Sequence, residues 1–157
     1  MDDLYKEIII DHYKNPRNSG SLDDATVVKE GKNPLCGDEL TLYLKITDDM
    51  IEDIKIESSG CSISLASASM MTKALKGQSI SEVKEIVSEF KEMISSHEES
   101  ISSDSTEDTK KDETDLLSHQ GKLPLEIQAL QGVVQYPVRI KCATLSWNTL
   151  ILALEQE

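Results

Sequence analysis

Three cysteines are the residues of this chain best suited to chemistry, and each is expected at the boundary of a secondary-structure element. Cys36 lies in a turn entering a strand, Cys61 follows a glycine at a strand-to-helix junction, and Cys142 is near the start of the last helix. A helix N-terminus favours the thiolate form of cysteine, so two of the three thiols are predicted to have that environment. An odd cysteine count does not suit a disulfide framework. Buried structural thiols, a reactive thiol and a metal site stay open.

Asp38 extends the three cysteines to a set of four candidate ligands. It follows Cys36 by two residues, so in an extended chain both side chains point to the same side, and Gly37 between them lets the backbone pass close to a bound group. Three thiolates and one carboxylate suit tetrahedral zinc, whereas thiolate sets also hold iron–sulfur clusters. Because the chain has no Cys-x-x-Cys pair, spacing alone leaves zinc, iron and three semi-buried structural cysteines as alternatives.

The elements that must position these residues follow from the periodicity of apolar side chains. Residues 40–46 and 51–57 alternate apolar and polar side chains around a short polar turn, which predicts a β-hairpin, and residues 25–29 predict one further strand. Helical spacing predicts helices over 2–14, 62–76, 79–94, 122–131 and 138–154. Strands followed by helices indicate an α+β fold, a three-stranded antiparallel sheet with helices packed on it.

The composition excludes several classes of function. The chain has 157 residues, the size of one domain, and its 29 acidic against 16 basic residues give a net charge of −13. This charge repels nucleic acids and anionic membrane surfaces. No apolar run approaches the roughly 18–20 residues that cross a bilayer, and the acidic start is unlike a signal peptide. We therefore expect a cytoplasmic protein with neither nucleic-acid nor membrane partners.

A strongly acidic segment interrupts the pattern of helices. Residues 95–119 hold eight acidic residues, two lysines and seven serines, with no aromatic residue. Such a segment cannot bury enough apolar surface to offset the entropy lost on ordering. We expect one domain over 1–157 with a flexible acidic insertion at about 95–119.

The segments around the cysteines resemble the IscU/NifU-type family of iron–sulfur cluster assembly proteins. The matching stretches are LYKEIIIDHYKNPRN, NPLCGD, SSGCSISLASASMM and RIKCATLSW. The resemblance implies the IscU/NifU-like fold and a metal site formed by Cys36, Asp38, Cys61 and Cys142. Within the family, the insertion that ends in LQGVVQYPVRIKC is similar to the SufU branch. Lys141 stands where scaffold-type members have a histidine, and their Leu-Pro-Pro-Val-Lys motif is replaced by Gln-Tyr-Pro-Val-Arg.

Membership of the SufU branch implies a zinc-dependent relay of sulfur. The implied partners are a SufS-type cysteine desulfurase, which supplies persulfide sulfur to Cys36, and a downstream iron–sulfur scaffold that receives it. The chain would then be a sulfurtransferase-like partner of the desulfurase. Arg139 matches an arginine that holds the freed ligand set and could pair with Asp38. The alternatives are a scaffold that assembles a [2Fe–2S] cluster, and a zinc-stabilised module without thiol chemistry.

Three further residues have plainer interpretations. His12 is expected at the surface or as a helix cap, since four metal ligands are already assigned. Trp147 is expected in the core of the last helix. Lys141 would sit beside the site, where a surface lysine and a charge that offsets the thiolates are both open.

Overall fold

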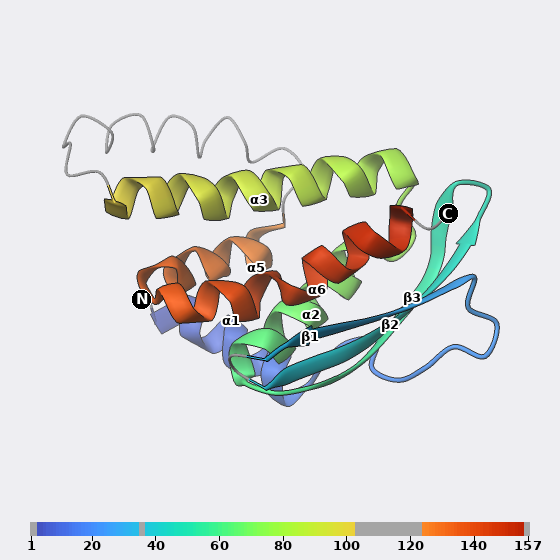
Figure 1. Cartoon of the computed structure of the whole chain (residues 1–157), viewed down its shortest axis with the longest axis horizontal. Helices are drawn as coiled ribbons and strands as arrows, with labels where there is room; N and C mark the ends of the chain where they lie inside the picture. Colours follow the sequence, from blue (N-terminus) through green and yellow to red (C-terminus); the bar gives the residue numbers. More distant parts are fainter. Residues whose placement is uncertain (1–2, 35–36, 103–123, 156–157) are drawn as a thin grey trace.

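Within the described residues, the fold is a three-stranded antiparallel sheet with α2 and α6 packed on one face (Figure 1). The computed structural model describes residues 3–34, 37–102 and 124–155. The strand order is β1-β2-β3. The elements are α1 (Asp3–Lys14), β1 (Val27–Asn33), β2 (Asp38–Thr47), β3 (Met50–Ser59), α2 (Ser62–Leu75), α3 (Ile80–Ser102), α5 (Leu125–Gln128), the 3-10 helix η1 (Ala129–Gln135) and α6 (Pro137–Glu155). The predicted α+β fold is confirmed.

The hairpin of β2 and β3 follows the predicted alternation of side chains. Leu42 and Leu44 on β2 and Ile54 on β3 are fully buried under the helices, while the residues between them face outward. Asp48 and Asp49 turn the chain with φ of 53° and 60°, a left-handed conformation that aspartate tolerates in tight hairpin turns. The alternation of apolar and polar side chains therefore predicts the position of this hairpin to within a few residues.

The first strand is longer than the sequence predicts. It was expected over 25–29 but extends to Asn33, and its pairing with β2 continues to the Asn33–Asp38 pair. Gly31 allows this extension, because a Cβ atom there would lie 2.1 Å from Thr149 Oγ1 on α6. The polar stretch remains a strand because its backbone pairs with β2 and packs closely against a helix.

Helices α2 and α6 form the layer next to the sheet, and α3 lies on the far side of that layer (Figure 1). Phe90 of α3 stacks on Trp147 of α6, with ring centroids 4.2 Å apart and planes inclined by 10°. Both side chains are fully buried, so the core position predicted for Trp147 is confirmed. Helix α6 is therefore held between the sheet and α3, which fixes the element that carries Cys142.

Helix α3 continues into the segment expected to be flexible. Ser79 caps its start by accepting a hydrogen bond from the Glu82 N–H at 3.2 Å, which satisfies one of the free donors of the first turn. The helix runs to Ser102, because elongating a helix costs less than starting one and no glycine or proline interrupts 78–120. Residues 103–119 of the predicted insertion lie outside the described residues. Neither α3 nor any other described helix has the length and apolar character to cross a membrane.

The expectation that His12 lies at the surface is wrong. Its side chain is 1% exposed, because α1 packs on α2 and brings the imidazole between two distant segments. Nδ1 lies 2.7 Å from Ser69 Oγ on α2, and Nε2 lies 2.6 Å from Glu126 Oε2 on α5. Glu126 also pairs with Lys73 at 2.6 Å. This polar network joins α1 and α2 to the segment that leads into α6.

Candidate metal centre

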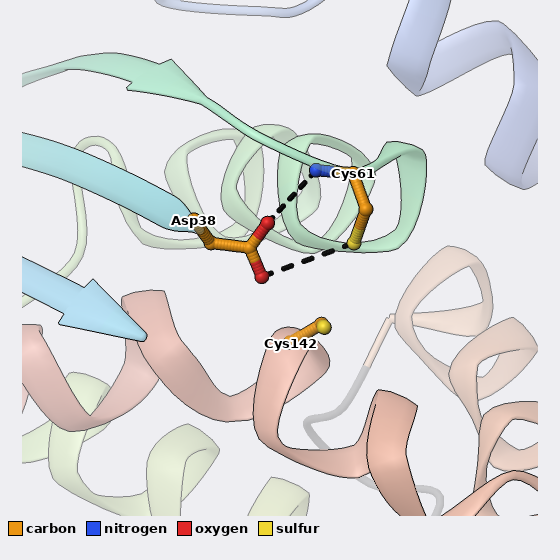
Figure 2. A group of neighbouring side chains, drawn as sticks. All are labelled: Asp38, Cys61 and Cys142. Carbon is orange, nitrogen blue, oxygen red and sulfur yellow. Dashed lines mark hydrogen bonds between the residues drawn. The ribbon is translucent and has the colours of Figure 1, made fainter. Parts of the chain in front are cut away.

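Asp38 is the acidic member of the candidate ligand set, and its side chain is fully buried. It is the first residue of β2 and is 0% exposed. Pairing of β2 with β3 places Glu39 opposite Ser59, so Asp38 lies beside the residues that connect β3 to α2. Its Oδ1 accepts a hydrogen bond from the Cys61 backbone N–H at 2.8 Å, and its Oδ2 lies 3.9 Å from Cys61 Sγ (Figure 2). One oxygen is thus anchored while the other faces the cysteine sulfur.

Gly60 makes the approach of Asp38 to Cys61 feasible. Its φ of +139° is a conformation that residues with a side chain rarely adopt, and a Cβ atom there would lie 2.1 Å from Asp38 Oδ1. The glycine that precedes the second cysteine therefore has both a conformational and a steric reason. The sequence shows Gly60 beside Cys61 but does not reveal this role, because the contact joins β2 to the residue that follows β3.

Cys61 occupies the N-cap position of α2, as predicted. Its backbone is extended, with φ −76° and ψ 162°, and it caps the helix without a side-chain hydrogen bond. The thiol is half-buried. The sulfur of Cys61 is therefore positioned by the start of α2.

Cys142 lies deeper in its helix than the sequence suggests. Helix α6 begins at Pro137, so Cys142 is in the second turn and lacks the helix-terminal environment predicted for it. Its side chain is 0% exposed. The sulfur lies 3.8 Å from the Asn33 Nδ2 donor and 3.9 Å from the Val138 carbonyl oxygen. Side chains and backbone therefore surround this sulfur on several sides.

These three residues bring ligand atoms from three separate elements to one place (Figure 2). One carboxylate oxygen of Asp38 and the sulfurs of Cys61 and Cys142 all lie within 4.8 Å of one another. Ligands of a tetrahedral zinc ion at about 2.0–2.3 Å are separated from each other by about 3.5 Å. The 3.9 Å between Asp38 Oδ2 and Cys61 Sγ is close to that separation. The donor set and its spacing could hold a metal ion such as zinc.

The fourth predicted ligand, Cys36, lies outside the described residues. Pairing fixes the described residues on either side: Asn33 and Asp38 are partners across β1 and β2, and the Gly37 N–H donates to the Asn33 carbonyl oxygen at 2.9 Å. Cys36 precedes Asp38 by two residues in the sequence and stays a predicted ligand.

Arg139 lies in the first turn of α6, three residues before Cys142. A hydrogen bond to Cys142, and then the charges of Cys61 and Cys142, raise the pKa of the Arg139 guanidinium above its ordinary value. The guanidinium contacts the Cys142 sulfur, which lies one turn along the same helix, whereas Cys61 belongs to the start of α2. Lys141, two residues further on, is exposed.

The chain belongs to the NifU-like N-terminal domain family, whose sequence pattern matches residues 4–113. The matched region includes Asp38 and Cys61, whereas Cys142 lies beyond it. Relatives that cover the third cysteine extend the match over nearly the whole chain.

Two curated relatives illustrate the two branches of the family. The chain is 43% identical over 157 residues to the zinc-dependent sulfurtransferase SufU of Bacillus subtilis, covering 100% of this chain and 93% of the relative. It is 37% identical over 153 residues to the iron–sulfur cluster assembly scaffold protein IscU of Thermotoga maritima, covering 98% and 94%. Both branches are thus similar to this chain over its full length.

Solved structures support the same family. A crystal structure from Fervidobacterium islandicum, described as a candidate cluster assembly scaffold protein for the SUF system, matches with a TM-score of 0.74, 33% identity and 94% of each chain covered. The NifU-like N-terminal protein of Brucella abortus matches with a TM-score of 0.74 at 21% identity, over 99% of this chain and 94% of that one. The second match shows that the fold is shared.

Proposed function

We propose that this chain is a zinc-binding sulfur-transfer protein of iron–sulfur cluster assembly. It accepts persulfide sulfur from a SufS-type cysteine desulfurase onto Cys36 and relays it to a scaffold. The observation that carries the proposal is the convergence of Asp38, Cys61 and Cys142 within 4.8 Å. The 43% identity to a zinc-dependent sulfurtransferase over the full length supports it. Cys36 would complete a set of three thiolates and one carboxylate.

The proposed metal has a limited part in this function: bound zinc would keep the cysteine sulfurs as thiolates and tie β2, α2 and α6 together. The protein itself distinguishes the cysteines. Cys61 is fixed at the N-cap of α2, and Cys142 is buried within α6. Cys36 lies between the end of β1 and the start of β2, in neither helix. This difference supports Cys36 as the acceptor.

The proposed transfer is an exchange between a thiolate and a persulfide, which needs no external oxidant or reductant. The Cys36 thiolate attacks the outer sulfur of the desulfurase persulfide, forming a new S–S bond at Cys36. The original S–S bond breaks, and the desulfurase cysteine leaves as a thiolate. Arg139 next to Cys61 and Cys142 would offset negative charge while Cys36 is engaged elsewhere.

The surface beside the sulfurs suits contact with a protein partner. Tyr136 and Val138, at the start of α6, are 54% and 63% exposed and flank Arg139 along the chain. Exposed apolar side chains next to a functional cation are typical of protein-binding surfaces. We propose that the protein acts in the cytoplasm, where thiols stay reduced.

A second candidate function is a scaffold on which a [2Fe–2S] cluster is assembled. Relatives named as scaffolds support it, including the one that is 37% identical over 98% of this chain. Lys141 in place of the scaffold histidine favours sulfur transfer, because a protonated lysine has no lone pair to offer a metal.

The experiment begins with metal and sulfide analysis of the anaerobically purified full chain. Sulfur transfer predicts about one zinc per chain and no acid-labile sulfide, whereas a scaffold predicts iron and sulfide in equal amounts. Desulfurase turnover is then measured with wild type and Cys36→Ser, and the persulfide is located by peptide mass spectrometry. Stimulation that survives in Cys36→Ser contradicts the proposed acceptor. A Cys36→Ser variant that loses folding rather than activity would indicate a structural module.

A further inference from the structure

We infer that Asn33 is a positioning residue of the metal centre, which holds the Cys142 sulfur in place from the end of β1. Its side-chain Nδ2 donates to Cys142 Sγ at 3.8 Å, across 109 positions of sequence. This inference rests on the proposed function, since it concerns the same site, but it assigns a role to a residue outside the four-ligand set.

Asn33 connects the segments of two ligands. Its backbone pairs with Asp38 at the first position of β2, and its carbonyl oxygen accepts the Gly37 N–H at 2.9 Å. Its side chain reaches α6 and contacts Cys142. One residue therefore fixes the end of the segment that carries Cys36 and, through its amide, the sulfur of the third cysteine.

The choice of partner indicates why an asparagine is buried here. Asn33 is 6% exposed and Cys142 is 0% exposed, so an amide without a partner in this place would be costly. The amide is the side-chain donor that reaches this sulfur from β1, while the Val138 carbonyl oxygen lies 3.9 Å from it on the side of α6. The Cys142 sulfur is therefore contacted from two different elements.

Donors to a ligand atom orient that atom and alter its affinity for the metal. The Asn33 amide leaves Cys142 oriented toward Asp38 Oδ2 and Cys61 Sγ, the atoms that complete the cluster. Cys142 would then be the ligand that stays in place when Cys36 leaves to accept sulfur. The division between a retained and a released cysteine thus has a structural cause outside the ligands.

The test compares Asn33→Leu with a matched control at the same contact of β1 and α6. Asn33→Leu keeps the approximate volume and removes the donor. Thr149→Val removes the hydrogen bond that the Thr149 hydroxyl donates to the Leu145 carbonyl, beside Gly31, without touching a sulfur. Both full-length variants are measured for zinc release to a chromophoric chelator and, as apo proteins, for alkylation of Cys142 relative to Cys61 by peptide mass spectrometry. If Asn33→Leu does not fold, Asn33→Ala replaces it in both assays.

We expect Asn33→Leu to release zinc about 10- to 100-fold faster than wild type, the usual effect of removing a residue that supports a ligand. Thr149→Val should release zinc at close to the wild-type rate. Apo Asn33→Leu should also show a raised ratio of Cys142 to Cys61 alkylation, because the Cys142 sulfur is no longer held in its buried position by the amide. Equal zinc release in the two variants, or an unchanged alkylation ratio, overturns the inference. If the wild type binds no zinc, the proposed function loses its cofactor, and the alkylation ratio alone decides the role of Asn33.

Discussion

The carboxylate of Asp38 accepts a hydrogen bond from the backbone N–H of Cys61, with 2.8 Å between Oδ1 and the nitrogen. One candidate ligand thus holds the backbone of another. Since Asp38 is fully buried, this bond links the start of β2 to the start of α2 out of contact with water. The second oxygen, Oδ2, remains directed at the Cys61 sulfur. Asp38 therefore has a structural task and a ligand position at once.

Removing this carboxylate should separate the two tasks. In Asp38→Ala we expect zinc to be largely retained, because three thiolates remain and water can fill the fourth position. Exchange of ligands should become slower. The free energy of unfolding of the apo protein should fall by about 1–3 kcal/mol, because the Cys61 N–H loses its buried acceptor. Zinc analysis checks the retention of metal, the rate of zinc transfer to a chelator checks ligand exchange, and denaturant unfolding checks the loss of stability. Complete loss of metal would contradict the first statement.

Much of the fold could be predicted from local patterns. The alternation of Leu40, Leu42 and Leu44 gave the buried face of β2, and all three are at most 4% exposed. The end of β1 could not be predicted, because its polar residues stay extended through pairing with β2 and the close contact of Gly31 with Thr149. Contacts between distant segments have no local signal.

The same distinction applies to the site. The residue types and the family resemblance indicated the ligand set, and the structure brings Asp38, Cys61 and Cys142 together. The roles of Gly60 and Asn33 depend on which segments meet in space. His12 was misjudged for that reason, since its partners Ser69 and Glu126 lie 57 and 114 positions away.

A side chain at Gly60 should damage the metal site, whereas a side chain at another glycine of similar conformation should not. Gly60→Ala meets backbone strain of about 1–3 kcal/mol and, in addition, a clash with Asp38 Oδ1 at 2.1 Å. Gly20→Ala is the control, because its φ of +123° is similar and nothing lies within 4 Å of its added Cβ. We expect both variants to lose stability but only Gly60→Ala to lose zinc affinity. Equal zinc affinity in the two variants would show that the Asp38 contact is not important for the site.

Arg139 should matter for sulfur transfer more than Lys141, although both side chains are exposed. The Arg139 guanidinium contacts Cys142, whereas Lys141 lies two positions along, about 200° around the helix. Loss of a hydrogen bond to a charged group lowers a rate or an equilibrium constant by about tenfold. We expect Arg139→Ala to lower desulfurase stimulation by that factor and Lys141→Ala to leave it nearly unchanged. Stimulation and persulfide formation on Cys36 are measured together; equal losses in both variants would indicate only a general effect of charge.

The packing of α1 should depend on pH through His12. Burial lowers the pKa of His12 below its ordinary value of 6.5, against the raising effect of the Glu126 hydrogen bond. The unfolded chain then binds the proton more readily, so stability is complete above pH 6.5 and falls as the pH drops toward the lowered value. Glu126, which faces His12, titrates in a lower range of pH. Hydrogen bonds from Lys73 and His12 lower the pKa of Glu126 despite its burial, so the stability that Glu126 contributes is lost only below its ordinary value of 4.5.

Unfolding measured from about pH 7 to pH 5 isolates the histidine, since the window lies above the Glu126 titration. His12→Gln cannot be protonated and should show a flatter stability profile than wild type over this range. His97 and His119 are unchanged in that variant, so they serve as an internal control. Identical slopes for the two proteins would show that other groups cause the pH dependence.

Metal removal should destabilise the whole domain rather than one loop. Asp38, Cys61 and Cys142 belong to β2, α2 and α6, so an ion bound by them links the sheet to both helices of the adjacent layer. A ligand that binds only the folded state stabilises it by about 2.7 kcal/mol when its free concentration is 100 times Kd. We expect a chelator to lower the Tm of the wild type in a single cooperative transition. Cys142→Ser, which lacks the retained ligand, should show a much smaller shift under the same chelator. A wild-type Tm that is indifferent to the chelator, in protein shown to contain zinc beforehand, would place the metal outside these three elements.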